Sequence, residues 1–187
     1  YKRWWTKAKK ALVKNSHVAI PAKKHEPYVL REEPLTPEQE ILEEFYFIKK
    51  PLQKILLAEK LHELSDNVDE IRKDLPQILE TLTDALKSAR QLSDTERLHG
   101  IWVRNDLARH LEREQIIAEN DGEEPEELPT LVEEKVNELE PTSKSIILAS
   151  DNLSVLATDL PAAYFKRFID LMTRVYPEEW KQKVVNL

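Results

Sequence analysis

The chain has 187 residues, and its 28 Lys and Arg against 35 Asp and Glu give a formal net charge of −7 at pH 7. It has no cysteine and only two glycines, which excludes disulfides, thiolate metal sites, thiol nucleophiles and glycine-rich nucleotide loops. The scarcity of glycine also disfavours a sheet protein with tight turns. We therefore expect an all-α fold, and no apolar run approaches the roughly 20 residues that span a bilayer.

The charge is distributed unevenly along the chain. Residues 1–31 contain nine Lys or Arg and a single Glu, a net charge of +8, so the remainder carries −15. A basic arm on an acidic body predicts that the arm binds a polyanion, whereas the body would repel one.

The first predicted element is a basic helix over residues 1–18, followed by a proline-punctuated arm that ends at residue 35. Its cations can neutralise phosphates, and its two tryptophans can stack on bases. The candidate RNA-binding residues are Lys2, Arg3, Trp4, Trp5, Lys7, Lys9, Lys10, Lys14, Lys23 and Lys24. Two alternatives stay open: the tryptophans pack on a neighbouring protein, or the helix lies at a membrane interface.

Residues 36–120 are predicted to form a long helical hairpin. A capping box with proline at the first turn, Thr36 to Gln39, starts its first helix. Beyond residue 56, apolar residues recur with a 4-3-4-3 spacing, which is typical of helices that wrap on one another. This helix-packing seam consists of Leu57, Leu61, Leu64, Val68, Ile71, Leu75, Ile78, Leu82 and Leu92, with Ala85 and Ala89 between the last two.

The seam widens in its second half, where Leu79 and Leu86 lie beside it. A wide stripe favours a helix packed on two neighbours in a bundle over a two-stranded rod. Pro51 and Pro76 are expected to bend or restart the long helix. We therefore expect a bent or folded-back pair rather than a straight rod.

A second capping box, Ser93 to Glu96, predicts a new helix that runs to about Asn120 and folds back antiparallel on the seam. Residues 121–145 are predicted to be an acidic linker with a short helix. Residues 146–187 follow as C-terminal helices, one over residues 146–160, the next from about residue 159 and a last short one after Pro177.

Two Glu-x-x-His steps, Glu59 to His62 and Glu96 to His99, resemble in spacing the ligand steps of di-iron bundles. In the heptad frame, however, Glu59 and His62 face away from the seam, and no complete helix separates the two steps. We expect exposed polar pairs, no metal and no cofactor.

These features predict a non-catalytic structural subunit of a large assembly. The basic arm would anchor it to ribosomal RNA, and the acidic body would contact neighbouring proteins. A sequence that starts without Met and has no acidic residue before Glu26 favours an organellar ribosomal protein of the mitochondrial matrix, with the cytoplasm as the alternative. The rival hypotheses are a stalk subunit of a membrane complex and, remotely, a di-metal helical enzyme.

Overall fold

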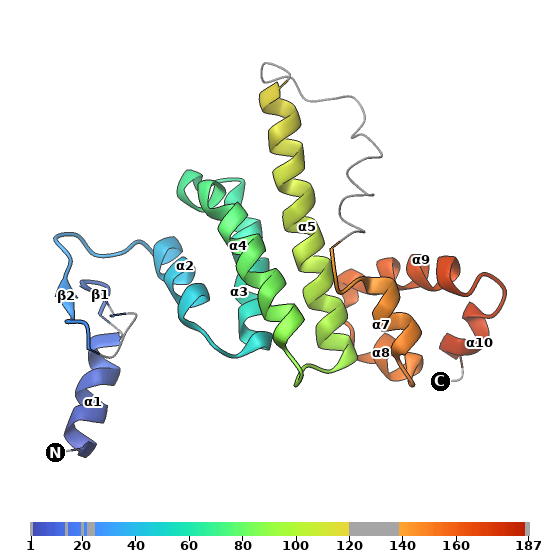
Figure 1. The fold of residues 1–187 in the computed structure, drawn as a ribbon, viewed down its shortest axis with the longest axis horizontal. Coiled ribbons are helices and arrows are strands. Elements are labelled where there is room, and N and C mark those ends of the chain that lie inside the picture. The colour runs from blue at the N-terminus through green and yellow to red at the C-terminus, as the bar shows by residue number, and fades with distance from the viewer. Residues whose placement is uncertain (1, 14, 20, 22–24, 120–138, 186–187) are drawn as a thin grey trace.

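The computed structural model describes residues 2–13, 15–19, 21, 25–119 and 139–185 (Figure 1). Helices dominate this described part, and a pair of two-residue strands is the sheet within it. The all-α prediction is confirmed. No helix in the described ranges is long and apolar enough to cross a membrane.

The described residues up to 35 form a small N-terminal unit at one end of the molecule (Figure 1). It contains α1 (Lys2–Val13), β1 (Val18–Ala19) and β2 (Val29–Leu30). The strands are antiparallel, with Val18 opposite Leu30. The predicted basic helix therefore ends at Val13, and part of the predicted irregular arm pairs as a short β-ribbon.

Arg31 connects this unit to the rest of the chain. Its Nη1 donates to the backbone oxygens of Ser16 at 2.9 Å and Val18 at 3.3 Å. Its Nη2 forms an ion pair with Glu43 of α2 (Pro37–Phe47). One side chain thus holds the ribbon together and ties it to the first helix of the body.

The predicted capping box at the start of α2 is present. The Gln39 amide donates to Thr36 Oγ1 at 3.3 Å, and the Thr36 amide donates to Gln39 Oε1 at 3.1 Å. Two of the otherwise unpaired donors of the first turn are satisfied by this exchange. Phe45 is the fully buried residue that anchors α2 to the core.

The heptad run is a folded-back pair of helices, one of the two arrangements expected, but the break lies at residues 66–68 and not at Pro76. The run is divided between α3 (Pro51–Ser65) and α4 (Asp69–Ser88), which fold back on each other (Figure 1). The break lies in a polar turn, where Arg72 donates to the backbone oxygens of Ser65 at 3.2 Å and Asp66 at 2.7 Å. These bonds satisfy carbonyls at the end of α3 that have no partner within the helix.

Pro76 lies inside α4 and does not restart the helix, whereas Pro51 is the first residue of α3. The seam residues nevertheless reach the core from both helices. Those that are buried are Leu61, Ile71, Leu75, Ile78, Leu82 and Leu92, and those partly buried against the core are Leu57, Leu64 and Val68.

The helix α5 (Asp94–Glu119) packs against both α3 and α4. Its predicted capping box is present, because the Ser93 amide donates to Glu96 Oε2 at 2.8 Å and the Glu96 amide to Ser93 Oγ at 3.2 Å. At Gly100 a Cβ atom would lie 2.7 Å from side-chain carbons of Ile55 and Leu86. Glycine therefore permits the close approach of the three helices.

The C-terminal part is a set of short helices: α7 (Ser143–Ala149), α8 (Leu153–Asp159), the 3-10 turn η1 (Ala162–Tyr164), α9 (Phe165–Val175) and α10 (Trp180–Val185). The helix predicted over residues 146–160 is thus two helices. Asn152 separates them, since its side chain accepts from the Val155 amide at 3.1 Å and caps α8. Most of the predicted acidic linker and its short helix lies outside the described residues.

Candidate nucleic-acid interface

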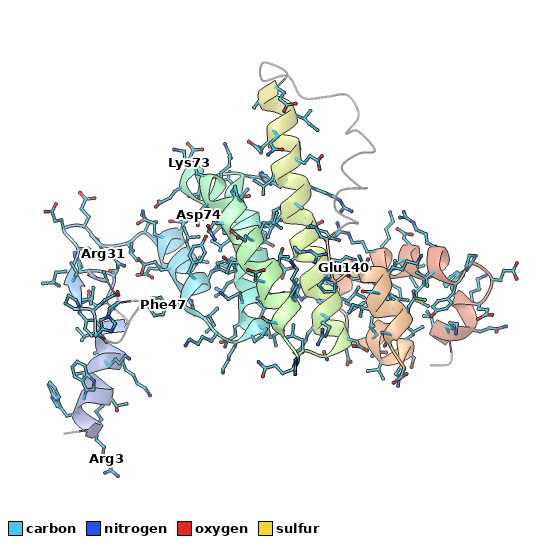
Figure 2. All side chains as sticks on the ribbon, viewed as in Figure 1. Arg3, Arg31, Phe47, Lys73, Asp74 and Glu140 are labelled. Carbon is cyan, nitrogen blue, oxygen red and sulfur yellow. The ribbon has the colours of Figure 1, made fainter. Side chains whose placement is uncertain are left out.

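The helix α1 divides its side chains between a basic face and an apolar face. Arg3, Lys7 and Lys10 follow one another at i, i+4 and i+7, so at 3.6 residues per turn they share one side of the helix. All three are exposed. We call them the basic stripe, and Figure 2 shows Arg3 at the outer end of α1. Trp5 and the half-buried Leu12 lie on the opposite side.

The two adjacent tryptophans have different surroundings. The ring of Trp5 meets Tyr28 edge-on, with 6.4 Å between centroids, and so packs α1 on the segment that leads into β2. The ring of Trp4 lies 6.3 Å from Trp5 and is 65% exposed. The sequence alone predicts the same role, stacking on bases, for both indoles. In the structure, Trp5 contacts Tyr28 although 44% of it is exposed, whereas Trp4 is the more exposed of the two rings and lies beside the basic stripe.

The structure places the other predicted arm residues as follows. Lys9 is exposed but lies on a different side of α1 from the stripe. Arg31, which contributed to the predicted positive charge, is engaged with Glu43 and the ribbon. The candidates whose side chains fall outside the described residues are Lys2, Lys14, Lys23 and Lys24.

The helix that follows the N-terminal unit has the opposite charge. Among the residues of α2 are four glutamates and no Lys or Arg, namely Glu38, Glu40, Glu43 and Glu44. A polyanion is therefore attracted to α1 and repelled by α2. The change from a basic to an acidic helix therefore occurs between α1 and α2.

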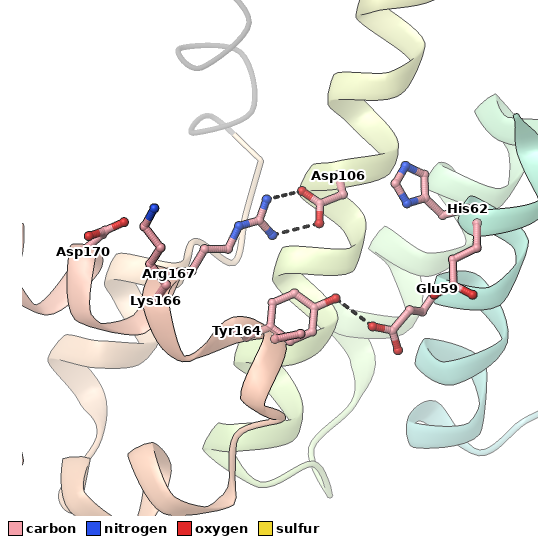
Figure 3. Close-up of a pocket in the computed structure, with 9 residues that line it drawn as sticks. Glu59, His62, Asp106, Tyr164, Lys166, Arg167 and Asp170 are labelled. Carbon is pink, nitrogen blue, oxygen red and sulfur yellow. Dashed lines mark hydrogen bonds and ion pairs between the residues drawn. The ribbon is translucent and has the colours of Figure 1, made fainter.

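A second candidate site is a polar cleft of about 550 Å³ between α3, α5 and the start of α9 (Figure 3). Tyr164 donates to Glu59 Oε1 at 2.8 Å across it, and Arg167 pairs through both Nη atoms with Asp106. The lining residues are Glu59, His62, Glu63, Asp106, Ala163, Tyr164, Lys166, Arg167 and Asp170. Since the Tyr164–Glu59 and Arg167–Asp106 contacts both join C-terminal residues to α3 or α5, we interpret the cleft as the polar junction of the C-terminal helices with the body.

Burial and the hydrogen bond to Glu59 raise the pKa of Tyr164 above its ordinary value. The hydrogen bond to Asp106 raises the pKa of Arg167. The raised pKa keeps the tyrosine neutral, so that it can donate to Glu59. The raised pKa likewise keeps the guanidinium charged, so that it can pair with Asp106.

The two Glu-x-x-His steps do not form exposed pairs as predicted. Glu59 reaches the buried His99, with 3.2 Å between Oε2 and Nε2, so the expectation that Glu59 faces away from the packing is wrong. The reason is that α5 covers a side of α3 that a long rod would leave open. Glu96 caps its own helix. His62 faces the ring of His110 at 5.5 Å, and burial lowers its pKa.

Among the described residues no group of three or more His, Cys, Asp or Glu is arranged to hold a metal ion. Glu59 instead accepts from Tyr164 and lies against His99. The contacts of this region within the described chain are those of a packed helix interface.

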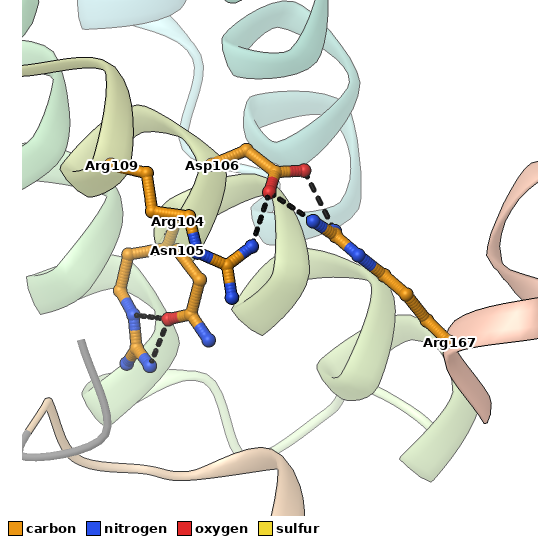
Figure 4. A network of polar contacts seen from close by, with 5 residues as sticks. All are labelled: Arg104, Asn105, Asp106, Arg109 and Arg167. Atoms are coloured by element: carbon orange, nitrogen blue, oxygen red, sulfur yellow. Dashed lines mark hydrogen bonds and ion pairs between the residues drawn. The ribbon is translucent and has the colours of Figure 1, made fainter. Parts of the chain in front are cut away.

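Arg104 is a further buried polar centre, with no exposed surface (Figure 4). Its guanidinium donates to Asn105 Oδ1 at 2.9 and 3.2 Å and to the backbone oxygens of Leu139 at 3.1 Å and Pro141 at 3.0 Å. Burial lowers its pKa to about 10. The side chain joins α5 to the segment that enters α7.

Comparison with known proteins gives one partial match. Residues 1–35 match the sequence family described as the GRAD helix-turn-helix domain. No curated protein and no solved structure matches the chain. The matched segment corresponds to the N-terminal unit, whose described residues contain one helix and the strand pair, and α2 begins two residues after the match ends.

Proposed function

We propose that the protein binds nucleic acid through the N-terminal unit and that its acidic helical body contacts protein neighbours in a larger assembly. The single observation that carries the proposal is the basic stripe of Arg3, Lys7 and Lys10, exposed on the outer side of α1. The match of residues 1–35 to a helix-turn-helix family supports it, because helix-turn-helix domains are a nucleic-acid-binding class.

The stripe suits a phosphate backbone for two physical reasons. Three cations on one side of a helix can contact successive phosphates and release their counterions. The opposite side of α1 is fixed on Tyr28 through Trp5, so the cations are presented outward by a seated helix rather than by a loose chain.

The role of the body is that of a non-catalytic scaffold. Two of its cleft contacts, Tyr164 with Glu59 and Arg167 with Asp106, join its own helices, and its net charge is negative, which suits protein contacts better than a second nucleic-acid contact. The narrower assignment to ribosomal RNA in a mitochondrial matrix remains a prediction from the sequence.

The test is the salt dependence of binding to a single-stranded RNA. The log–log slope of affinity against salt is roughly −0.7 for each single-strand phosphate neutralised. Replacing Arg3, Lys7 and Lys10 with Ala should therefore weaken binding and flatten the slope by up to about 2. Lys9→Ala, on another side of the same helix, should have a smaller effect.

Two outcomes would contradict the proposal. One is binding at full strength by the triple variant. The other is an intact chain that binds anionic vesicles but no nucleic acid, which would instead favour an interfacial helix.

A further inference from the structure

Three features lie outside the proposed function: the polar cleft, the contacts of His99 and His62, and the exposed indole of Trp4. The first two belong to the internal junction already described. Trp4 is different, because a large apolar ring that is 65% exposed does not contribute to the core and lies beside a row of cations.

We propose that α1 is built for single-stranded nucleic acid, with Trp4 stacking on an unpaired base while the basic stripe follows the phosphates. This inference rests on the proposed function and names the form of nucleic acid that it takes. The geometry of three neighbouring side chains, Trp4, Trp5 and Tyr28, carries it.

The first step concerns the support of the indole. Trp5 is held against Tyr28 and in turn lies 6.3 Å from Trp4, with 32° between the two ring planes. Trp5 therefore contacts both Tyr28 and Trp4. Because Trp4 has this neighbouring ring, less entropy is lost when a base stacks on it.

The second step concerns what a stacking ring needs. A base inside a duplex has both faces covered by its neighbours, whereas an unpaired base offers a free face to an aromatic side chain. At 3.6 residues per turn, Lys7 and Ala11 lie on nearly the same side of α1 as Trp4. The neighbours of the ring on the helix are therefore a cation and a small side chain rather than bulky apolar residues. A strand whose phosphates contact the stripe can turn a base onto the ring.

The alternative is that the unit recognises double-stranded DNA through a groove. A helix-turn-helix reads the major groove with its second helix. The next described helix along this chain, α2, lies beyond the matched residues 1–35 and has four glutamates and no cation, so it is unsuited to a groove lined by phosphates. The basic stripe is also short: it extends about 10 Å along the helix axis from Arg3 to Lys10, at 1.5 Å per residue.

The experiment compares binding of the full chain to a single-stranded RNA, a single-stranded DNA of the same sequence and the corresponding DNA duplex, by fluorescence anisotropy at fixed salt. We expect the single strands to bind more tightly than the duplex. Trp4→Ala should weaken single-strand binding about 5- to 150-fold, the equivalent of about 1–3 kcal/mol per stacked base, with little change in the salt slope. Duplex binding should change little.

Trp5→Phe controls for the fold of the unit, because a phenyl ring can still meet Tyr28 edge-on. It should retain single-strand binding within a few-fold and leave circular dichroism unchanged. If Trp4→Ala binds single strands as well as the intact chain does, or if the duplex is preferred, the single-strand inference is wrong while the proposed function stands. If none of the three nucleic acids binds, the proposed function itself fails.

Discussion

Two arginines of the helical body and one of the N-terminal unit are used in opposite ways. In the body, Arg104 has no exposed surface and Arg167 is paired with Asp106, so both cations hold segments of the chain together. On α1, Arg3 is exposed at the outer end of a stripe. The difference teaches that charge alone does not mark an interface: what matters is whether folding gives the cation an internal partner.

The two regions also differ in what holds them together. The body has a continuous apolar core to which α2 to α5 and α7 to α10 contribute. The described part of the unit is held by an edge-on aromatic contact, a two-residue strand pair, the buried Val18 and the bonds of Arg31. Changes in the body should therefore act on stability, and changes in the unit should act on binding.

The largest expected effect is in the core of the body. Leu82→Asp places an unpaired charge at a fully buried position of α4 and should cost about 4 kcal/mol or more, enough to abolish cooperative unfolding. The check is thermal unfolding by circular dichroism. Gln77 is exposed on the same helix, so Gln77→Asp should change the melting temperature little. Equal effects at the two positions would contradict the assignment of Leu82 to the buried helix-packing seam.

A smaller loss of stability is expected at the buried polar centre formed by Arg104. Arg104→Met leaves the backbone oxygens of Leu139 and Pro141 without this donor and should destabilise the chain by about 2–3 kcal/mol. Urea unfolding measures the loss. The exposed Arg90 provides the matched control as Arg90→Met, and RNA affinity should be unchanged in both variants while they remain folded.

Arg31 connects the N-terminal unit to the body, so its loss should affect the attachment of the unit rather than the core. Arg31→Met removes the ion pair with Glu43 and two bonds to the ribbon, and should raise protease cleavage between residues 31 and 37 several-fold. Arg3→Met should leave cleavage as it is and weaken RNA binding. If Arg3→Met raised the cleavage and Arg31→Met alone weakened RNA binding, the roles assigned to the two arginines would be wrong.

The smallest effect concerns alkaline pH. Since the pKa of Tyr164 is raised by burial and by its bond to Glu59, the folded chain keeps this proton when the unfolded chain has lost it. The contribution is present below about pH 10 and is lost as pH rises above that value. Tyr164→Phe should lower stability by about 1 kcal/mol at pH 7 and flatten its decline between about pH 9.5 and 11, as measured by urea unfolding.

Much of the fold could be predicted because its signals are local. The capping boxes at Thr36 and Ser93 and the apolar spacing of the seam depend on residues only a few positions apart. The break at residues 66–68 was missed because the spacing continues through the turn without losing register. A folded-back pair and a single rod then have the same apolar pattern, and tertiary packing decides between them.

The basic, tryptophan-bearing helix could be predicted as well, but not the division of labour within it. Trp5 meets Tyr28, a partner 23 positions away, and Arg31 meets Glu43 across the boundary of the unit. The junction of Tyr164 with Glu59 joins residues 105 positions apart. No local pattern indicates such pairs, so their side chains could not be separated from exposed ones before the structure was known.

Our central proposal is that nucleic acid is contacted by the N-terminal unit and not by the body. Photo-cross-linking of the full chain to a single-stranded RNA, followed by mass spectrometry of the cross-linked peptides, tests it most directly. We predict cross-links within residues 1–35, concentrated at Trp4 and the basic stripe. Cross-links that map chiefly to the body, for example to the cleft around Arg167, would contradict the account.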